Sequence, residues 1–73
     1  MFVKIVKQGG SRVEEVYVDD GATVGDALDI AGIDPTGYNI RLNRVDVTVD
    51  TVLNNGADAT NVITLLQAIK GGK

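Results

Sequence analysis

Two short stretches near the start of the chain have the apolar content and the two-residue period of strands. Residues 2–7 are rich in Val, Ile and Phe and place Val3 and Ile5 on one face, and residues 12–18 place Val16 and Val18 on one face, opposite Tyr17. Because Gly9-Gly10 lies between the two stretches, they predict a β-hairpin.

The segment from residue 23 to 32 repeats its apolar residues at helical spacing instead. Thr23, followed by Asp26 three residues later, has the form of a capping box at a helix N-terminus. Gly32 is placed to end the helix, because glycine favours the left-handed conformation found there. The apolar stripe consists of Val24, Ala27, Leu28 and Ala31.

The second half of the chain predicts a turn at residues 34–37 and three more strands, at 38–43, 45–49 and 61–69. Asn43-Arg44 suits a tight reversal between the first two of these strands. The last run is so apolar that we expect it to be buried on both faces for part of its length.

The order of these elements predicts an α+β domain with the succession ββαβββ. One helix must then cover one face of a mixed sheet of four to five strands, with the first and last strands side by side in its centre. Val52 is expected to close the bottom of the core with Leu53, and residues 54–58 form a loop by composition. The predicted core residues are Val3, Ile5, Val16, Val18, Val24, Leu28, Ile40, Leu42, Leu53 and Ile63.

The length and composition limit the possible functions. A chain of 73 residues holds one core, so we divide it into a single domain at residues 1–70 and a flexible tail at 71–73. It contains no cysteine and no histidine, which removes thiolate chemistry and the commonest general base and metal ligand. We therefore expect a protein without catalytic residues, metal or cofactor, and not an enzyme.

The charge pattern disfavours nucleic acids and membranes as partners. The formal net charge is −3, and the basic residues are scattered along the chain rather than gathered in a stripe. Lys4 and Lys7 interrupt the apolar N-terminal stretch, which is too short for a signal peptide or a membrane span. These features predict a cytoplasmic monomer.

The acidic and glycine-containing motifs inside the chain do not have the spacing or the context of functional sites. Glu14 and Glu15 are neighbours on a strand and point to opposite faces, which prevents them from acting together as acid and base. Gly9-Gly10-Ser11 precedes a strand rather than a helix, so a hairpin turn explains it better than a phosphate loop. A cluster of four aspartates lacks the spacing of a calcium loop, and a solvated helix start is the better interpretation. Its members are Asp19, Asp20, Asp26 and Asp29.

The two tyrosines leave two interpretations open. Tyr17 and Tyr38 lie at strand ends, where a tyrosine serves either as an interface anchor or as a half-buried packing residue.

Three stretches followed by Gly71-Gly72 resemble the β-grasp sulfur carriers. The stretches are residues 22–28 at the helix start, 38–43 in the third strand and 62–66 in the last strand. The similar proteins are the thiamine-pathway sulfur carrier, the small subunit of molybdopterin synthase and their archaeal ubiquitin-like relatives. The resemblance implies the ubiquitin-like β-grasp fold.

The resemblance also implies a function for the tail. In that family a partner enzyme adenylates the terminal glycine carboxylate, and sulfur then displaces AMP. A ubiquitin-like modifier uses the same activated carboxyl to form an amide bond with a lysine. Lys73 would first be removed, so that Gly72 carries the activated acyl group. Gly71 has no Cβ atom and would let the chain fit into a narrow channel of the partner enzyme.

The residues leave a second function open. A plain binding module would dock a partner protein on an exposed strand edge or on the outer face of the sheet. The segment Gly71-Gly72-Lys73 would then be an inert end of the chain.

Overall fold

Five strands and one helix make up the described part of the chain, which comprises residues 1–8, 13–55 and 59–67 of the computed structural model. Their order is the predicted ββαβββ, and it confirms the α+β class. The elements are β1 (Phe2–Lys7), β2 (Val13–Tyr17), α1 (Val24–Ala31), β3 (Tyr38–Leu42), β4 (Val45–Val47) and β5 (Val62–Gln67).

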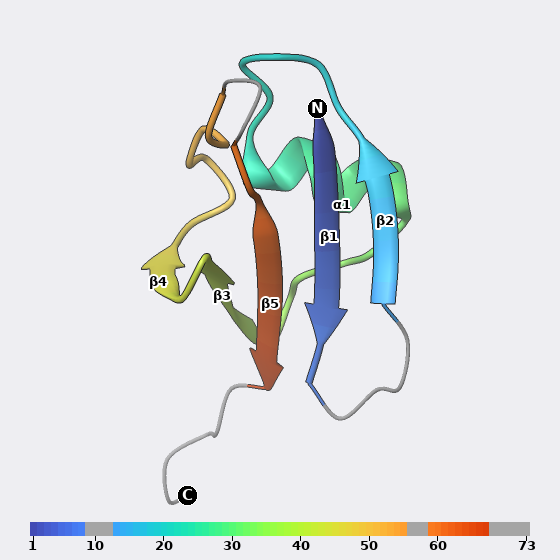
Figure 1. Cartoon of the computed structure of the whole chain (residues 1–73). Helices are drawn as coiled ribbons and strands as arrows, with labels where there is room; N and C mark the ends of the chain where they lie inside the picture. The colour runs from blue at the N-terminus through green and yellow to red at the C-terminus, as the bar shows by residue number, and fades with distance from the viewer. Residues whose placement is uncertain (9–12, 56–58, 68–73) are drawn as a thin grey trace, which may run out of the picture.

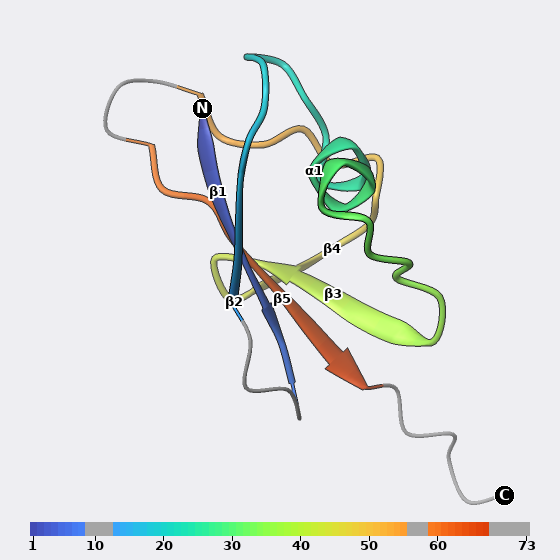
Figure 2. The same ribbon diagram turned by 90° about the vertical axis from the view of Figure 1, so that its right-hand side faces the viewer.

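The strands form one mixed sheet in the order β2-β1-β5-β3-β4 (Figure 1). The first and last strands pair in parallel, as predicted, and all other neighbours are antiparallel. Figure 2 shows that α1 lies along one side of the sheet. In the described residues no second helix covers the opposite face.

Local sequence signals define both ends of α1. The backbone N–H of Asp26 donates to the hydroxyl oxygen of Thr23 at 3.2 Å, and the N–H of Thr23 donates to the Asp26 carboxylate at 3.0 Å. This is the predicted capping box. Gly32 ends the helix with a φ of 73°, in the left-handed region where a side chain is unfavourable.

The segment after β4 supplies carbonyl groups to the first turn of α1. The N–H of Val24 donates to the carbonyl of Thr51, and the N–H of Gly25 donates to the carbonyl of Val49, both at 2.9 Å. The strand predicted at 45–49 is therefore two residues too long. The alternating valines continue past the end of β4, but their backbone there bonds to the helix and not to the sheet.

The reversal between β3 and β4 occurs at Asn43 and Arg44, as predicted. Both have positive φ, 52° and 74°, which suits the two-residue turn that matches the twist of a hairpin. The Asn43 side chain also donates to the carbonyl of Thr60 at 2.7 Å and accepts from the N–H of Val62 at 2.9 Å. The turn is thus attached to the beginning of β5.

The core lies between α1 and the sheet, and nine of the ten predicted core residues are buried. Val16 is the exception, since it packs against the core but is only half-buried on the edge strand β2. Val52 was placed in the core wrongly, because its side chain is 54% exposed while that of Leu53 is 2% exposed. Ala27 and Leu65 are also fully buried.

The last strand begins at Val62, one residue after the predicted start at Asn61. Within β5, Ile63 and Leu65 are buried against the helix side, while Val62, Thr64 and Leu66 are half-buried on the other face. Burial on both faces is therefore only partial, and residues 68 and 69 lie outside the described residues.

Candidate functional site

The predicted activation tail, Gly71, Gly72 and Lys73, lies outside the described residues. So does residue 70, where the domain was expected to end. What the structure does describe is the strand that leads toward the tail. The site is therefore built from β5 and from the surfaces around it.

The strand β5 is paired on both sides. It runs parallel to β1, with Leu65 opposite Lys7, and antiparallel to β3, with Gln67 opposite Tyr38. The N–H of Gln8 adds a bond to the carbonyl of Leu65 at 2.8 Å. The pairing of β5 extends to Gln67, its last residue, so the strand is held in the sheet up to the point where the described chain ends.

A lysine and a tyrosine meet near the end of β5. The Lys7 ammonium nitrogen lies 5.1 Å from the centre of the Tyr38 ring, within the range of a cation–π contact. Both side chains have the same parity as the buried residues of their strands, so they lie on the helix side of the sheet. Tyr38 is half-buried against the core, as one of the two interpretations of this residue predicted.

The helix-free face of the sheet carries exposed apolar side chains on β1 and β2. Phe2, Val13 and Tyr17 are 41%, 51% and 74% exposed, and their positions alternate with those that face the core. The rings of Phe2 and Tyr17 lie on directly opposed residues, with their centres 5.2 Å apart. Tyr17 is thus not a half-buried packing residue but one end of an exposed aromatic pair. We call Phe2 and Tyr17 the aromatic patch. Val13 lies apart from it, opposite Val6 and beyond the exposed pair of Lys4 and Glu15.

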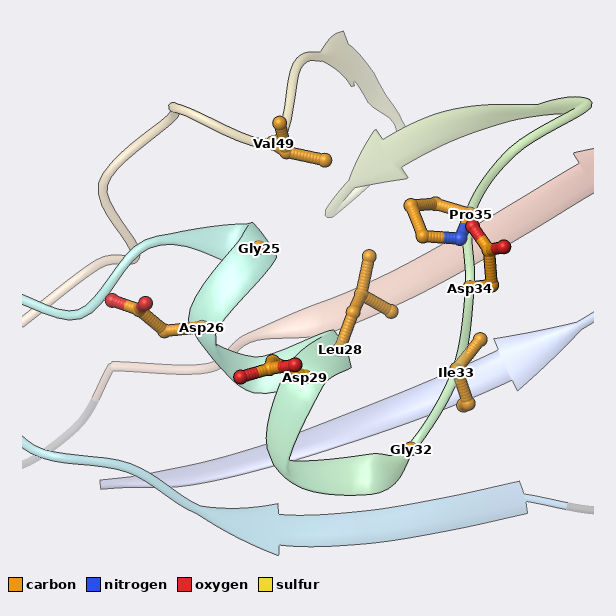
Figure 3. A pocket seen from close by; sticks show the side chains of 9 residues that line it. All are labelled: Gly25, Asp26, Leu28, Asp29, Gly32, Ile33, Asp34, Pro35 and Val49. Carbon is orange, nitrogen blue, oxygen red and sulfur yellow. The ribbon is translucent and has the colours of Figure 1, made fainter.

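A groove of about 690 Å³ lies on the other side of the molecule, between α1, the segment that follows it and Val49 (Figure 3). Its apolar side chains are Leu28, Ile33, Pro35 and Val49, and the glycines Gly25 and Gly32 complete the apolar lining.

Three carboxylates belong to the lining of the same groove. Asp26 is bonded to the helix start, and Asp29 is exposed one turn further along α1. Asp34 accepts from the hydroxyl of Thr36 at 2.7 Å and from its N–H at 3.0 Å. These two hydrogen bonds hold the pKa of Asp34 below its ordinary value, so this carboxylate is ionised at neutral pH.

The acidic residues weighed in the sequence are not arranged for metal binding or acid–base chemistry. In the part of the chain that the structure describes, no group of three acidic, histidine or cysteine side chains is placed to hold a metal ion. Glu14 and Glu15 lie opposite Ile5 and Lys4 and point to opposite faces, as predicted.

The outer face of the sheet was predicted from the sequence as a possible docking surface, but the aromatic pair of Phe2 and Tyr17 on it and the groove beside α1 were not. The opposed positions of Phe2 and Tyr17 follow from the hairpin register, so this signal was available. The groove depends on the approach of Val49 to α1, which no local pattern indicates.

The described residues include no helix long and apolar enough to cross a membrane.

Comparison with known proteins identifies the fold. No family model matches the chain, and no curated protein matches it in sequence. Among solved structures, SAMP1 from Haloferax volcanii is 24% identical, with a TM-score of 0.73, over 99% of this chain and 100% of that protein. A ubiquitin-like protein from Caldiarchaeum subterraneum is 22% identical, with a TM-score of 0.59, over 97% of this chain and 100% of that protein. The chain therefore has the ubiquitin-like β-grasp fold that its sequence predicted, and the likeness at this identity is one of fold.

Proposed function

We propose that this chain is a ubiquitin-like carrier or modifier that acts through Gly71-Gly72. The observation that supports the proposal is the position of this double glycine in the sequence, a few residues after the central strand of a β-grasp domain. Gly72 is five residues beyond Gln67, the last residue of β5. Five extended residues span up to about 18 Å, enough for a terminal carboxylate to enter a partner's site while the domain stays folded.

The chemistry would be carried out by the partner enzyme. The Gly72 carboxylate would attack the α-phosphate of ATP and release pyrophosphate, giving an acyl adenylate. Hydrosulfide would then displace AMP to leave a thiocarboxylate, or a lysine amine would displace AMP and lose a proton to form an amide bond. The chain itself supplies the carboxylate and no catalytic side chain, so we propose a monomeric protein that is not an enzyme.

Removal of Lys73 is part of the proposal. With Lys73 in place, the terminal carboxylate belongs to a residue with a long charged side chain. A terminal glycine has no side chain and could enter a narrow channel of the partner enzyme. A peptidase that cleaves after Gly72 would generate the working form.

Intact mass spectrometry of the protein from its native cell tests this function. We expect a species that lacks Lys73, and a second species in which one oxygen of the terminal carboxylate is replaced by sulfur, or a conjugate. If every molecule retains Lys73, and neither a thiocarboxylate nor a conjugate is found, the proposal is wrong.

A biochemical test compares variants of the chain in a desalted extract of the native cell. A chain that ends at Gly72 should stimulate exchange between ATP and pyrophosphate, while the full chain should do so only after cleavage. In the chain that ends at Gly72, Gly71→Val should abolish the exchange by adding a branched side chain in the channel. The matched control, Lys70→Ala, keeps both glycines and should retain it.

The aromatic patch supports a second candidate function, that of a binding module with an inert tail. An exposed Phe–Tyr pair on an uncovered sheet face is the kind of feature that anchors a protein partner. Deletion of residues 71–73 and substitution Tyr17→Ser discriminate the two functions. A module loses its partner only with Tyr17→Ser, whereas a carrier loses its conjugates and thiocarboxylate with the deletion.

A further inference from the structure

The groove beside α1 is formed by the backbone itself. One wall is Val49, whose carbonyl accepts a 2.9 Å hydrogen bond from the N–H of Gly25 in α1. The other wall is the segment after α1, where the N–H of Ile33 donates to the carbonyl of Leu28 at 2.9 Å. A Cβ atom at Gly25 would lie 3.1 Å from the Val49 carbonyl oxygen, so a side chain there would push Val49 away by a few tenths of an ångström. Backbone hydrogen bonds thus hold both walls of the groove in place.

The lining combines an apolar floor with acidic residues. Leu28 is fully buried, Ile33 and Pro35 are half-buried, and Val49 remains 38% exposed. Figure 3 shows the Asp29 and Asp34 carboxylates on either side of Leu28 and Ile33. A ligand that covers this surface must therefore offer both apolar area and positive charge.

The region around α1 carries acidic residues and no basic ones. Residues 19–37, which include α1 and the segments on both sides of it, contain five aspartates and neither lysine nor arginine. The four basic residues of the described part lie on β1, on β3 and in the turn after β3. No basic side chain of α1 or its flanking segments neutralises the carboxylates of the groove.

We propose that this groove binds a basic peptide segment of a partner protein. An apolar side chain of the peptide covers Val49 and the floor, and flanking arginine or lysine side chains meet Asp29 and Asp34. Charge complementarity of this kind selects the partner and speeds association. The proposal does not involve the C-terminal tail and is independent of the proposed function.

The same charges argue against other ligands. Nucleic acid would be repelled by the carboxylates. A metal ion would need several oxygen ligands around one point, and no such group exists in the described residues. A second copy of the chain would have to present its own basic residues to the groove. Binding of a second copy would depend on the concentration of the chain alone, which distinguishes it from peptide binding.

NMR titration of the ¹⁵N-labelled full chain tests the proposal. The probe is the peptide acetyl-Arg-Ala-Leu-Ala-Arg-amide, and the control peptides replace both arginines by glutamate or the leucine by serine. The arginine–leucine peptide should shift the amide signals of Gly25, Asp29, Gly32 and Val49. Raising the ionic strength from about 0.05 M to about 0.3 M should weaken binding at least about threefold, because it shortens the Debye length.

Variants locate the binding site. The double substitution Asp29→Asn with Asp34→Asn should weaken binding about fivefold, since it removes two exposed ion pairs. Glu15→Gln on the helix-free face of β2 is the matched control for loss of negative charge and should leave binding unchanged. The amide spectrum of each variant reports whether it is folded.

Four results of the titrations with peptide or salt would overturn the proposal, and a fifth comes from the chain alone. They are equal binding of the glutamate peptide, unchanged binding by the double variant, shifts confined to the sheet face, and equal shifts produced by magnesium or calcium chloride alone. Concentration-dependent shifts of the same amides without peptide would assign the groove to a second copy and would also contradict it.

Discussion

The buried side chain of Asn61 offers a direct test of how β5 is attached to the preceding segment. Asn61 is 2% exposed, and its amide group makes two hydrogen bonds of 3.0 Å with the backbone of Asn54, one as acceptor and one as donor. Substitution Asn61→Ala removes both bonds and leaves the N–H and the carbonyl of Asn54 without these partners. At about 1 kcal/mol of net stability for each bond, the free energy of unfolding should fall by about 2 kcal/mol.

Urea unfolding followed by circular dichroism measures this loss. A decrease of about 2 kcal/mol corresponds to a melting temperature lower by about 10 °C in a domain of this size. Hydrogen exchange at the Asn54 amide should also become faster in the variant. The matched control is Asn39→Ala, an exposed asparagine on β3 for which a change of about 0.5 kcal/mol or less is expected. If the two variants lose equal stability, or if the Asn54 amide keeps its protection, the bonds of Asn61 do not hold this junction.

Three further predictions follow from the fold. Gly32→Ala should lower the free energy of unfolding by about 1 kcal/mol in the same urea assay, because the residue has a φ of 73° and its added methyl meets no other atoms. Leu65→Ala should cost about 3 kcal/mol, since the side chain is 0% exposed between α1 and the sheet, and a smaller effect than that of Gly32→Ala would contradict its place in the core. The pKa of Asp34, measured by NMR titration, should lie below 3.8 and rise toward it in Thr36→Val, which removes the hydroxyl donor. Because folding lowers this pKa, its stabilising contribution is present above pH 3.8 and disappears as the pH falls through the lower folded value.

Elements that depend on neighbouring residues could be predicted from the sequence. The capping box at Thr23 and Asp26 and the glycine at position 32 are local signals, and both ends of α1 were predicted correctly. The reversal at Asn43-Arg44 is local as well. The core could be predicted because alternation and helical spacing identify one face of each element, whatever its partners are.

Features that depend on distant segments could not be predicted in the same way. The alternating valines at 45–49 indicated a strand, but the backbone at Val49 bonds to Gly25, which is distant in the sequence. Val52 is apolar and adjacent to the buried Leu53, yet its side chain points to solvent. The groove beside α1 has the same origin. It exists because Val49 approaches the helix, and no pattern within either segment reports that contact.

The double glycine was visible in the sequence, but it lies outside the described residues and stays a prediction. The contact between Lys7 and Tyr38 near the end of β5 depends on the pairing of β5 with β1 and β3, which no local pattern indicates. The aromatic patch required the register of the hairpin, in which Phe2 lies opposite Tyr17.

The hydrogen bonds of the first turn of α1 determine whether this end of the helix can bind an anion. The free N–H groups at a helix N-terminus commonly bind phosphate. Here the first four donors are all occupied, by the carbonyls of Thr51 and Val49 and by the hydroxyl and carbonyl of Thr23. A nucleotide phosphate would meet no vacant donor at this end of α1, and Asp26 would repel it. The first turn of α1 therefore offers no site for the phosphates of a nucleotide.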